Sequence, residues 1–215
     1  MNTDDPLDAP RDCPSHLPAG VAAGGTPGAP AALLRPALWF YGAMLAAAWG
    51  ICWWTDGSPF VHPAVPRPGG VRPLGDAAIG VVTGALLIVS SDQLTRRTRT
   101  GEALADALAE MLRGLSLVDC MALALASGLA EEAFFRGLLQ PHIGLVAATA
   151  VFGLAHFVPR RDLAPWSLFA VAGGLLFGVL YEATGNLIAP VVAHVTVNGV
   201  NLRLLSRRPV AVVRS

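Results

Sequence analysis

The sequence predicts an all-α, polytopic membrane protein built as a bundle of about six transmembrane helices. Of its 215 residues 53% are hydrophobic and 14% are charged, whereas a soluble domain carries about 25% charged residues. The mean hydropathy of +0.54 is also high. The apolar residues gather in six segments whose lengths approach the ~20 residues that a helix needs to cross a bilayer.

Before the first span the chain is polar and poor in large side chains. Residues 1–35 are rich in Pro, Gly and Ala and contain four aspartates. Because this composition cannot bury a core, we expect a disordered N-terminal tail. Its acidic start, with no apolar stretch directly after it, is unlike a cleaved signal peptide.

Residues 36–91 contain the first two predicted helices. The first, 36–54, carries four tryptophans suited to the membrane interface. The second, 77–91, has Gly80 and Gly84 spaced for close helix packing. The polar stretch 92–114 follows, with Leu and Ala at helical spacing between charges. We expect it to be a cytoplasmic amphipathic linker that lies partly along the membrane surface.

The remaining four predicted spans lie within residues 115–205, and residues 206–215 form a C-terminal tail. The spans are 117–139, 142–158, 166–183 and 186–205. With six crossings, both tails and the loops 92–114 and 158–165 share one side. That side holds twelve arginines against two on the other, so the positive-inside rule predicts cytoplasmic termini.

Charge inside the third span, SGLAEEAFFRGLLQ (127–140), is the most informative feature of the sequence. A charged side chain at the centre of a spanning helix costs roughly 2.5–3.5 kcal/mol, so it marks function by default. Glu132 and Arg136 are four residues apart and can form an ion pair on one helix face. Glu131 points about 100° away and has no such partner, which suits a general base.

Two later helices add neutral polar groups. His156 follows Phe152 by four residues, and Asn198 follows His194 by four, so each pair shares one helix face. If the helices pack together, Glu131 and His156 can hold a water molecule. His194 and Asn198 can then donate to an oxyanion, a role worth about 3 kcal/mol per donor in other hydrolases.

The motifs EEAFFRG (131–137), FGLAH (152–156) and HVTVN (194–198) resemble the CPBP family (CAAX protease and bacteriocin-processing, also called ABI), over about residues 115–205. The resemblance implies a glutamate-type intramembrane endopeptidase with a catalytic membrane core, in a bacterial inner membrane. It implies that Glu131 and His156 activate the water and that His194 and Asn198 stabilise the oxyanion. Glu132 and Arg136 would support them.

The predicted boundaries conflict with this site. At 1.5 Å per residue, Glu131 lies about 20 Å from the cytoplasmic start of its helix, whereas His156 lies close to the cytoplasmic end of the next. The two can meet only if the third helix starts after Leu117, if it is tilted, or if the fourth extends past Pro159.

Other functions remain open from the residues alone. A non-catalytic membrane immunity or partner-binding protein could keep the same cavity, and Glu131, His156 and His194 could hold zinc. Without an HExxH motif we expect no cofactor. The cysteines Cys13, Cys52 and Cys120 form no metal or disulfide pattern. The partners we expect are the lipid bilayer and a membrane-embedded or lipid-anchored protein or peptide, and no nucleic acid, since the net charge is zero.

Overall fold

The computed structural model describes residues 29–55, 57–62 and 70–209. Most of the predicted N-terminal tail, Cys13 and residues 210–215 lie outside these residues. Seven α-helices, a π-helical segment and a short 3-10 helix make up the regular structure of the described part. Its only strand-like pairing is one isolated bridge between Val61 and Asn186.

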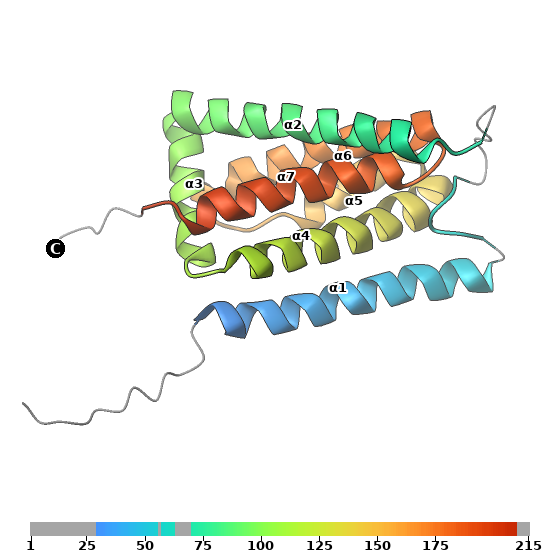
Figure 1. Cartoon of the computed structure of the whole chain (residues 1–215), viewed down its shortest axis with the longest axis horizontal. Coiled ribbons are helices and arrows are strands. Elements are labelled where there is room, and N and C mark those ends of the chain that lie inside the picture. Colours follow the sequence, from blue (N-terminus) through green and yellow to red (C-terminus); the bar gives the residue numbers. More distant parts are fainter. Residues whose placement is uncertain (1–28, 56, 63–69, 210–215) are drawn as a thin grey trace, which may run out of the picture.

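Six of the helices run roughly along one axis, as Figure 1 shows. They are α1 (Ala29–Trp54), α2 (Pro73–Arg97), α4 (Leu117–Glu132), α5 (Gln140–Ala155), α6 (Ala164–Thr184) and α7 (Ile188–Ser206). The shorter α3 (Arg99–Leu112) lies across one end of this bundle. The start of α1 and the end of α7 lie at that same end.

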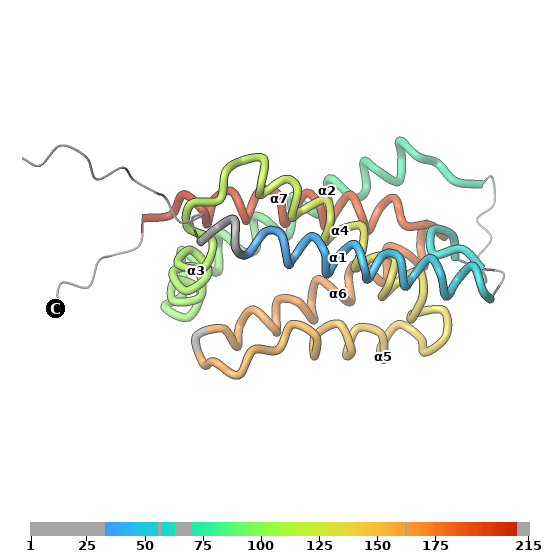
Figure 2. Tube along the Cα trace, turned by 90° about the horizontal axis from the view of Figure 1, so that it is seen from below, coloured from blue at the N-terminus to red at the C-terminus, as the bar shows by residue number. Residues whose placement is uncertain are grey.

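Five helices of the described part are long and apolar enough to cross a membrane. One of them, Leu117–Ala155, is 39 residues long and combines α4, the π-helix η1 (Ala133–Leu139) and α5. Figure 2 shows that this unit folds back on itself, so that α5 runs antiparallel to α4. The predicted all-α membrane bundle is confirmed, and its six passes arise because one long helix is bent.

The bend lies at Gly144, whose backbone angles are φ 81° and ψ 162°. This combination is essentially restricted to glycine, because a Cβ atom would clash with the neighbouring carbonyl groups. A Cβ placed on Gly144 would meet no other atom within 4 Å. The backbone angles alone therefore require glycine at this turn.

Helix boundaries differ from the predicted ones by several residues, as three examples show. Helix α1 begins before the expected start and runs through Pro36. Helix α2 continues through the polar residues 92–97, where Arg96 pairs with Asp92 over 2.8 Å one turn away. Helix α5 ends at Ala155, three residues before the predicted end, because the chain becomes extended ahead of Pro159.

Helix α7 lies at the centre of the bundle, in contact with α2, α3, α4 and α6. Small residues allow this close packing. A Cβ on Gly80 would lie 2.5 Å from the Ala189 carbonyl oxygen, and one on Gly84 would lie 2.7 Å from Cβ of Thr196. The predicted packing role of these two glycines is confirmed.

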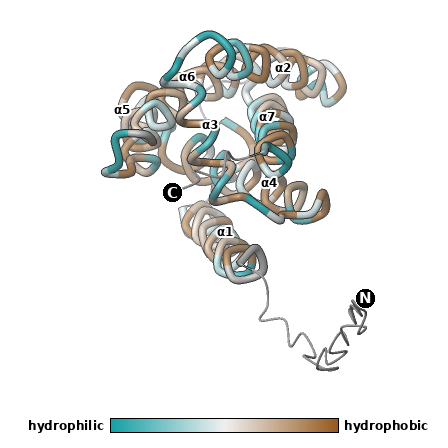
Figure 3. The backbone as a smooth tube through the Cα atoms, turned by 90° about the vertical axis from the view of Figure 1, so that its left-hand side faces the viewer, coloured by the Kyte–Doolittle hydropathy of each residue, from teal (hydrophilic) through white to brown (hydrophobic). Residues whose placement is uncertain are grey.

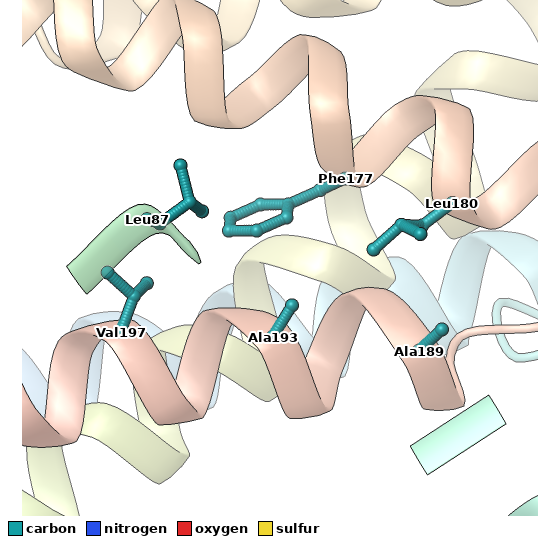
Figure 4. Packing of buried hydrophobic residues seen from close by; sticks show 6 residues of the cluster. All are labelled: Leu87, Phe177, Leu180, Ala189, Ala193 and Val197. Atoms are coloured by element: carbon teal, nitrogen blue, oxygen red, sulfur yellow. The ribbon is translucent and has the colours of Figure 1, made fainter. Parts of the chain in front are cut away.

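The apolar core between α2, α6 and α7 supports the residues described below. It contains Leu87, Phe177, Leu180, Ala189, Ala193 and Val197 (Figure 4). The outer surface is apolar as well, and Figure 3 shows hydrophobic residues along the helices. Trp39, Leu74 and Val146 are 78–89% exposed, whereas several charged side chains are buried. This inverted distribution is that of an integral membrane protein.

Candidate active site

The two adjacent glutamates end helix α4, where the backbone changes from α to π geometry. Glu131 and Glu132 are 5% and 0% exposed. In the following segment η1 the backbone bonds span five residues, as in the bond from the Gln140 N–H to the Phe135 carbonyl. Such π-bulges are rare and frequent at functional sites. The sequence pattern predicted a regular α-helix here and missed this change.

Arg136 is held inside the bundle by three kinds of contact. Its Nη1 donates to Oε1 of Glu132 over 3.0 Å, as the spacing of the two residues predicted. Its Nη2 donates to the Gly174 carbonyl of α6 over 2.9 Å. The guanidinium also lies 4.4 Å from the ring centre of Phe152. Arg136 therefore connects η1 to α5 and α6, and its charge is compensated.

His194 is bound to the second glutamate. Its Nδ1 lies 2.7 Å from Oε1 of Glu132, and its ring stacks on Phe177 at 5.1 Å between centroids. Because an ionised carboxylate only accepts hydrogen bonds, Nδ1 carries a hydrogen. The Nε2 of a neutral His194 is then an acceptor. The donor role expected of His194 therefore requires a hydrogen on Nε2 as well.

His156 follows the last residue of α5 and adopts φ −96° and ψ 4°. Its Nδ1 lies 2.9 Å from the Phe152 carbonyl oxygen one turn earlier. A carbonyl can only accept, so Nδ1 again carries the hydrogen and Nε2 is free to accept. This Nε2 lies 3.7 Å from Oε2 of Glu131.

The bend at Gly144 explains how Glu131 and His156 meet. Glu131 lies 13 residues before Gly144 and His156 lies 12 residues after it, so the two reach the same depth in antiparallel helices. Helix α4 does start at Leu117, and α5 does not extend past Pro159. After His156 the chain leaves the helix, and α6 begins at Ala164. The conflict expected from the sequence arose because the prediction placed the start of the third span and the end of the fourth at the same level of the membrane.

Glu131 is the point where these groups converge. Its Oε2 lies 3.7 Å from Nε2 of His156 and 3.9 Å from Nε2 of His194. Within the described residues this buried oxygen has no hydrogen-bond partner. Oε2 of Glu131 and Nε2 of His156 are thus two acceptors that face each other without a hydrogen between them. A water molecule, which supplies two O–H donors, satisfies both.

Asn198 lies one helical turn beyond His194 but contacts a different residue of α4. Its Nδ2 donates to Oγ of Ser127 over 3.0 Å. Ser127 itself precedes Glu131 by one turn, so Asn198 lies alongside the cluster rather than within it. Asn198 keeps a second N–H, because an amide nitrogen carries two.

The sequence motifs assign no site residue to the first two helices, so they do not include Tyr41 of α1. Its hydroxyl lies within electrostatic reach of the Glu131 carboxylate. A usable signal was present, since tyrosine in spanning helices is typical of the membrane interface, whereas Tyr41 lies at the middle of α1.

A cavity of about 570 Å³ opens between α3 and the helices α2, α6 and α7. Asn198 and Asn201 line it on α7, and Leu104 and Leu108 line it on α3. Its wall is mostly apolar, and its size is typical of ligand sites. The cavity thus leads from the end of the bundle that carries α3 to the last residue of the HVTVN motif.

The described residues contain no group of three or more His, Cys, Asp or Glu side chains that is placed to hold a metal ion. Cys52 and Cys120 are buried free thiols.

Residues 113–200 match the family model described as type II CAAX prenyl endopeptidase Rce1-like. This finding confirms the resemblance for that segment and relates it to a family of membrane endopeptidases. The segment contains Glu131, Glu132, Arg136, His156, His194 and Asn198.

One curated relative is an uncharacterized protein, YpbD, of Bacillus subtilis (strain 168). It is 41% identical over 87 residues, which make up 40% of this chain and 44% of that protein. The similarity thus covers less than half of either chain. No solved structure matches the chain.

Proposed function

We propose that this chain is an intramembrane endopeptidase that hydrolyses peptide bonds of membrane-associated proteins or peptides with an activated water molecule. The observation that carries the proposal is the convergence of Glu131, His156 and His194 on one buried point. The match of residues 113–200 to a family of membrane endopeptidases supports it.

In this mechanism the water donates one hydrogen bond to Oε2 of Glu131 and the other to Nε2 of His156. Both groups accept, because Nδ1 of His156 is occupied by the Phe152 carbonyl. The water oxygen is then free to attack the carbonyl carbon of the substrate. Glu131 takes the proton during the attack and passes it to the departing amine, so one group serves as general base and general acid.

His194 and Asn198 stabilise the oxyanion. Glu131 and Glu132 carry two negative charges and Arg136 one positive charge, so a protonated His194 makes the buried cluster neutral. Glu132 holds one proton of that imidazolium at Nδ1, and Nε2–H becomes the donor toward the oxyanion. Asn198 contributes the N–H that Ser127 does not use.

The substrate we propose is embedded in the bilayer or anchored to it by a lipid. An apolar peptide segment fits the cavity below α3, because the cavity combines an apolar wall with the amide of Asn198 at its inner part. The arginine-rich end of the bundle, which includes α3 and the end of α7, we place on the cytoplasmic side, with both termini.

The test is Glu131→Gln in the full-length protein, reconstituted in lipid vesicles and assayed on membrane peptides identified by comparing membrane proteomes of mutant and wild-type cells. We expect complete loss of cleavage with unchanged thermal stability. Glu182→Gln is the matched control, because Glu182 is exposed and bonded to Gln140 outside the cluster. Full turnover by folded Glu131→Gln protein excludes the proposed mechanism. Absence of cleavage by the wild type favours the non-catalytic partner-binding function.

A further inference from the structure

One face of α1 follows α4 towards Glu131. Both helices run in the same direction in Figure 1. Leu34 and Ala37 pack in the core cluster at the start of α4. Leu45 and Ala48 pack in the cluster at the start of η1. Tyr41 belongs to the same face of α1, midway between these contacts, and therefore lies opposite the last turns of α4.

The Tyr41 side chain is half-buried, and its hydroxyl lies within electrostatic reach of the Glu131 carboxylate on the helix against which α1 packs. Tyrosine in a spanning helix ordinarily places its hydroxyl in the headgroup region. At mid-helix that hydroxyl needs a polar partner inside the bundle. Glu131 is an acidic group within reach of this hydroxyl.

The two oxygens of Glu131 are not equivalent. Oε2 faces the two imidazoles and has no hydrogen-bond partner in the described part of the chain. Oε1 is therefore the oxygen left for a donor that approaches from the α1 side. This division leaves Oε2 for the water molecule and fixes the rotation of the carboxylate around its last bond.

We propose that Tyr41 is a positioning residue of this site, whose hydroxyl donates to Oε1 of Glu131 and directs Oε2 toward the water held with His156. The inference rests on the proposed function. It also assigns α1, which lies outside the matched segment 113–200, a role in the active site. A catalytic core without α1 would lack this donor.

The experiment compares the only two tyrosines of the chain, Tyr41 and Tyr181. Tyr41→Phe removes one hydroxyl and nothing else. We expect kcat to fall about tenfold, the equivalent of about 1.4 kcal/mol for one hydrogen bond to a charged group, while KM and the melting temperature stay unchanged. Tyr181→Phe is the control, because the buried Tyr181 hydroxyl has no hydrogen-bond partner within the described residues. Its kcat should equal that of the wild type.

The outcomes separate the two proposals. Wild-type kcat in Tyr41→Phe overturns the positioning role while the endopeptidase function stands. An equal loss of kcat in Tyr41→Phe and Tyr181→Phe also overturns it. So does a loss of kcat in Tyr41→Phe that is accompanied by a lower melting temperature. Absence of cleavage by the wild type contradicts the function itself, and the positioning role then depends on the spectroscopic test below.

That test does not require activity. In a Tyr181→Phe background, replacement of tyrosine by 3-fluorotyrosine labels position 41 alone, and its fluorine resonance reports the environment of that ring. We expect Glu131→Gln to shift this resonance and Glu182→Gln to leave it in place. A resonance that is insensitive to Glu131→Gln shows that the two side chains do not interact, and the proposal fails.

Discussion

Nδ1 of His194 lies 2.7 Å from Oε1 of Glu132, and this contact leaves Nε2 of His194 facing Glu131. The second glutamate of the EEAFFRG motif is thus connected to the HVTVN motif as well as to Arg136. It holds the orientation and the tautomer of the imidazole, which are the properties that decide what a histidine can donate.

Glu132→Gln should separate this role from simple packing. Glutamine keeps the shape and can still accept from Nδ1 of His194, but it removes the charge that favours an imidazolium. We expect kcat to fall about 10- to 100-fold, as activity does when a partner that orients a metal-binding histidine is lost, with a smaller change in KM. Steady-state kinetics measure the effect, with Glu182→Gln as the control variant. Unchanged kcat would contradict the charge balance proposed for the cluster.

Arg136→Ala should lower the amount of folded protein more than its specific activity. The substitution leaves Glu132 buried beside a vacated guanidinium site, and breaking a buried ion pair in this way costs about 3–5 kcal/mol. Melting temperature and yield in detergent measure it. Arg136→Lys is the informative companion, because lysine keeps the charge but cannot bond Glu132 and Gly174 with a planar fork. The melting temperature of Arg136→Lys should lie between those of the wild type and Arg136→Ala. Normal stability of Arg136→Ala would refute the structural role assigned to Arg136.

Gly144→Ala should destabilise the protein by about 1–3 kcal/mol through backbone strain alone, because an added Cβ meets no neighbour there. It should also lower activity, since this bend sets Glu131 and His156 at one depth. The control is Gly173→Ala in α6, where the nearest atom to an added Cβ is 3.9 Å away. Alanine is the better helix former, so we expect no loss of stability at position 173. Equal melting temperatures for the two variants would argue against the strain.

Leu108→Trp should raise KM for a membrane peptide and leave kcat nearly unchanged. Leu108 lines the cavity below α3, so an indole there fills space that the substrate segment needs. Ala103→Trp, on the exposed side of the same helix, controls for the effect of a tryptophan on α3. A KM that is equal in both variants would remove the cavity from the proposed substrate path.

Chelators distinguish the water mechanism from the zinc alternative. Both histidines donate Nδ1 to a partner and direct Nε2 at Glu131, an arrangement that zinc-binding histidines also show. We expect activity to be unaffected by prolonged chelation and the purified protein to contain no stoichiometric metal. Loss of activity with EDTA or phenanthroline and its recovery with Zn²⁺ would establish the metalloprotease instead.

The spacing of residues along single helices predicted much of the site. The four-residue separation of Glu132 and Arg136 predicted their ion pair, because side chains at this spacing share a helix face. The same rule placed Asn198 on the side of α7 that carries His194. It could not identify the partners of these side chains, since Ser127, Gly174 and Phe177 lie on other segments of the chain and contact them only after packing.

Hydropathy and helical period are local properties, so they predicted an all-α membrane protein with Glu131, Glu132 and Arg136 inside it, but not the burial of Asp76. The tertiary structure decided which atoms meet. The bend at Gly144 brought His156 to Glu131, the contact with Glu132 set the orientation of His194, and the packing of α1 against α4 brought Tyr41 near Glu131. Each of these depends on distances between segments far apart in the chain, which periodicity along one helix does not contain.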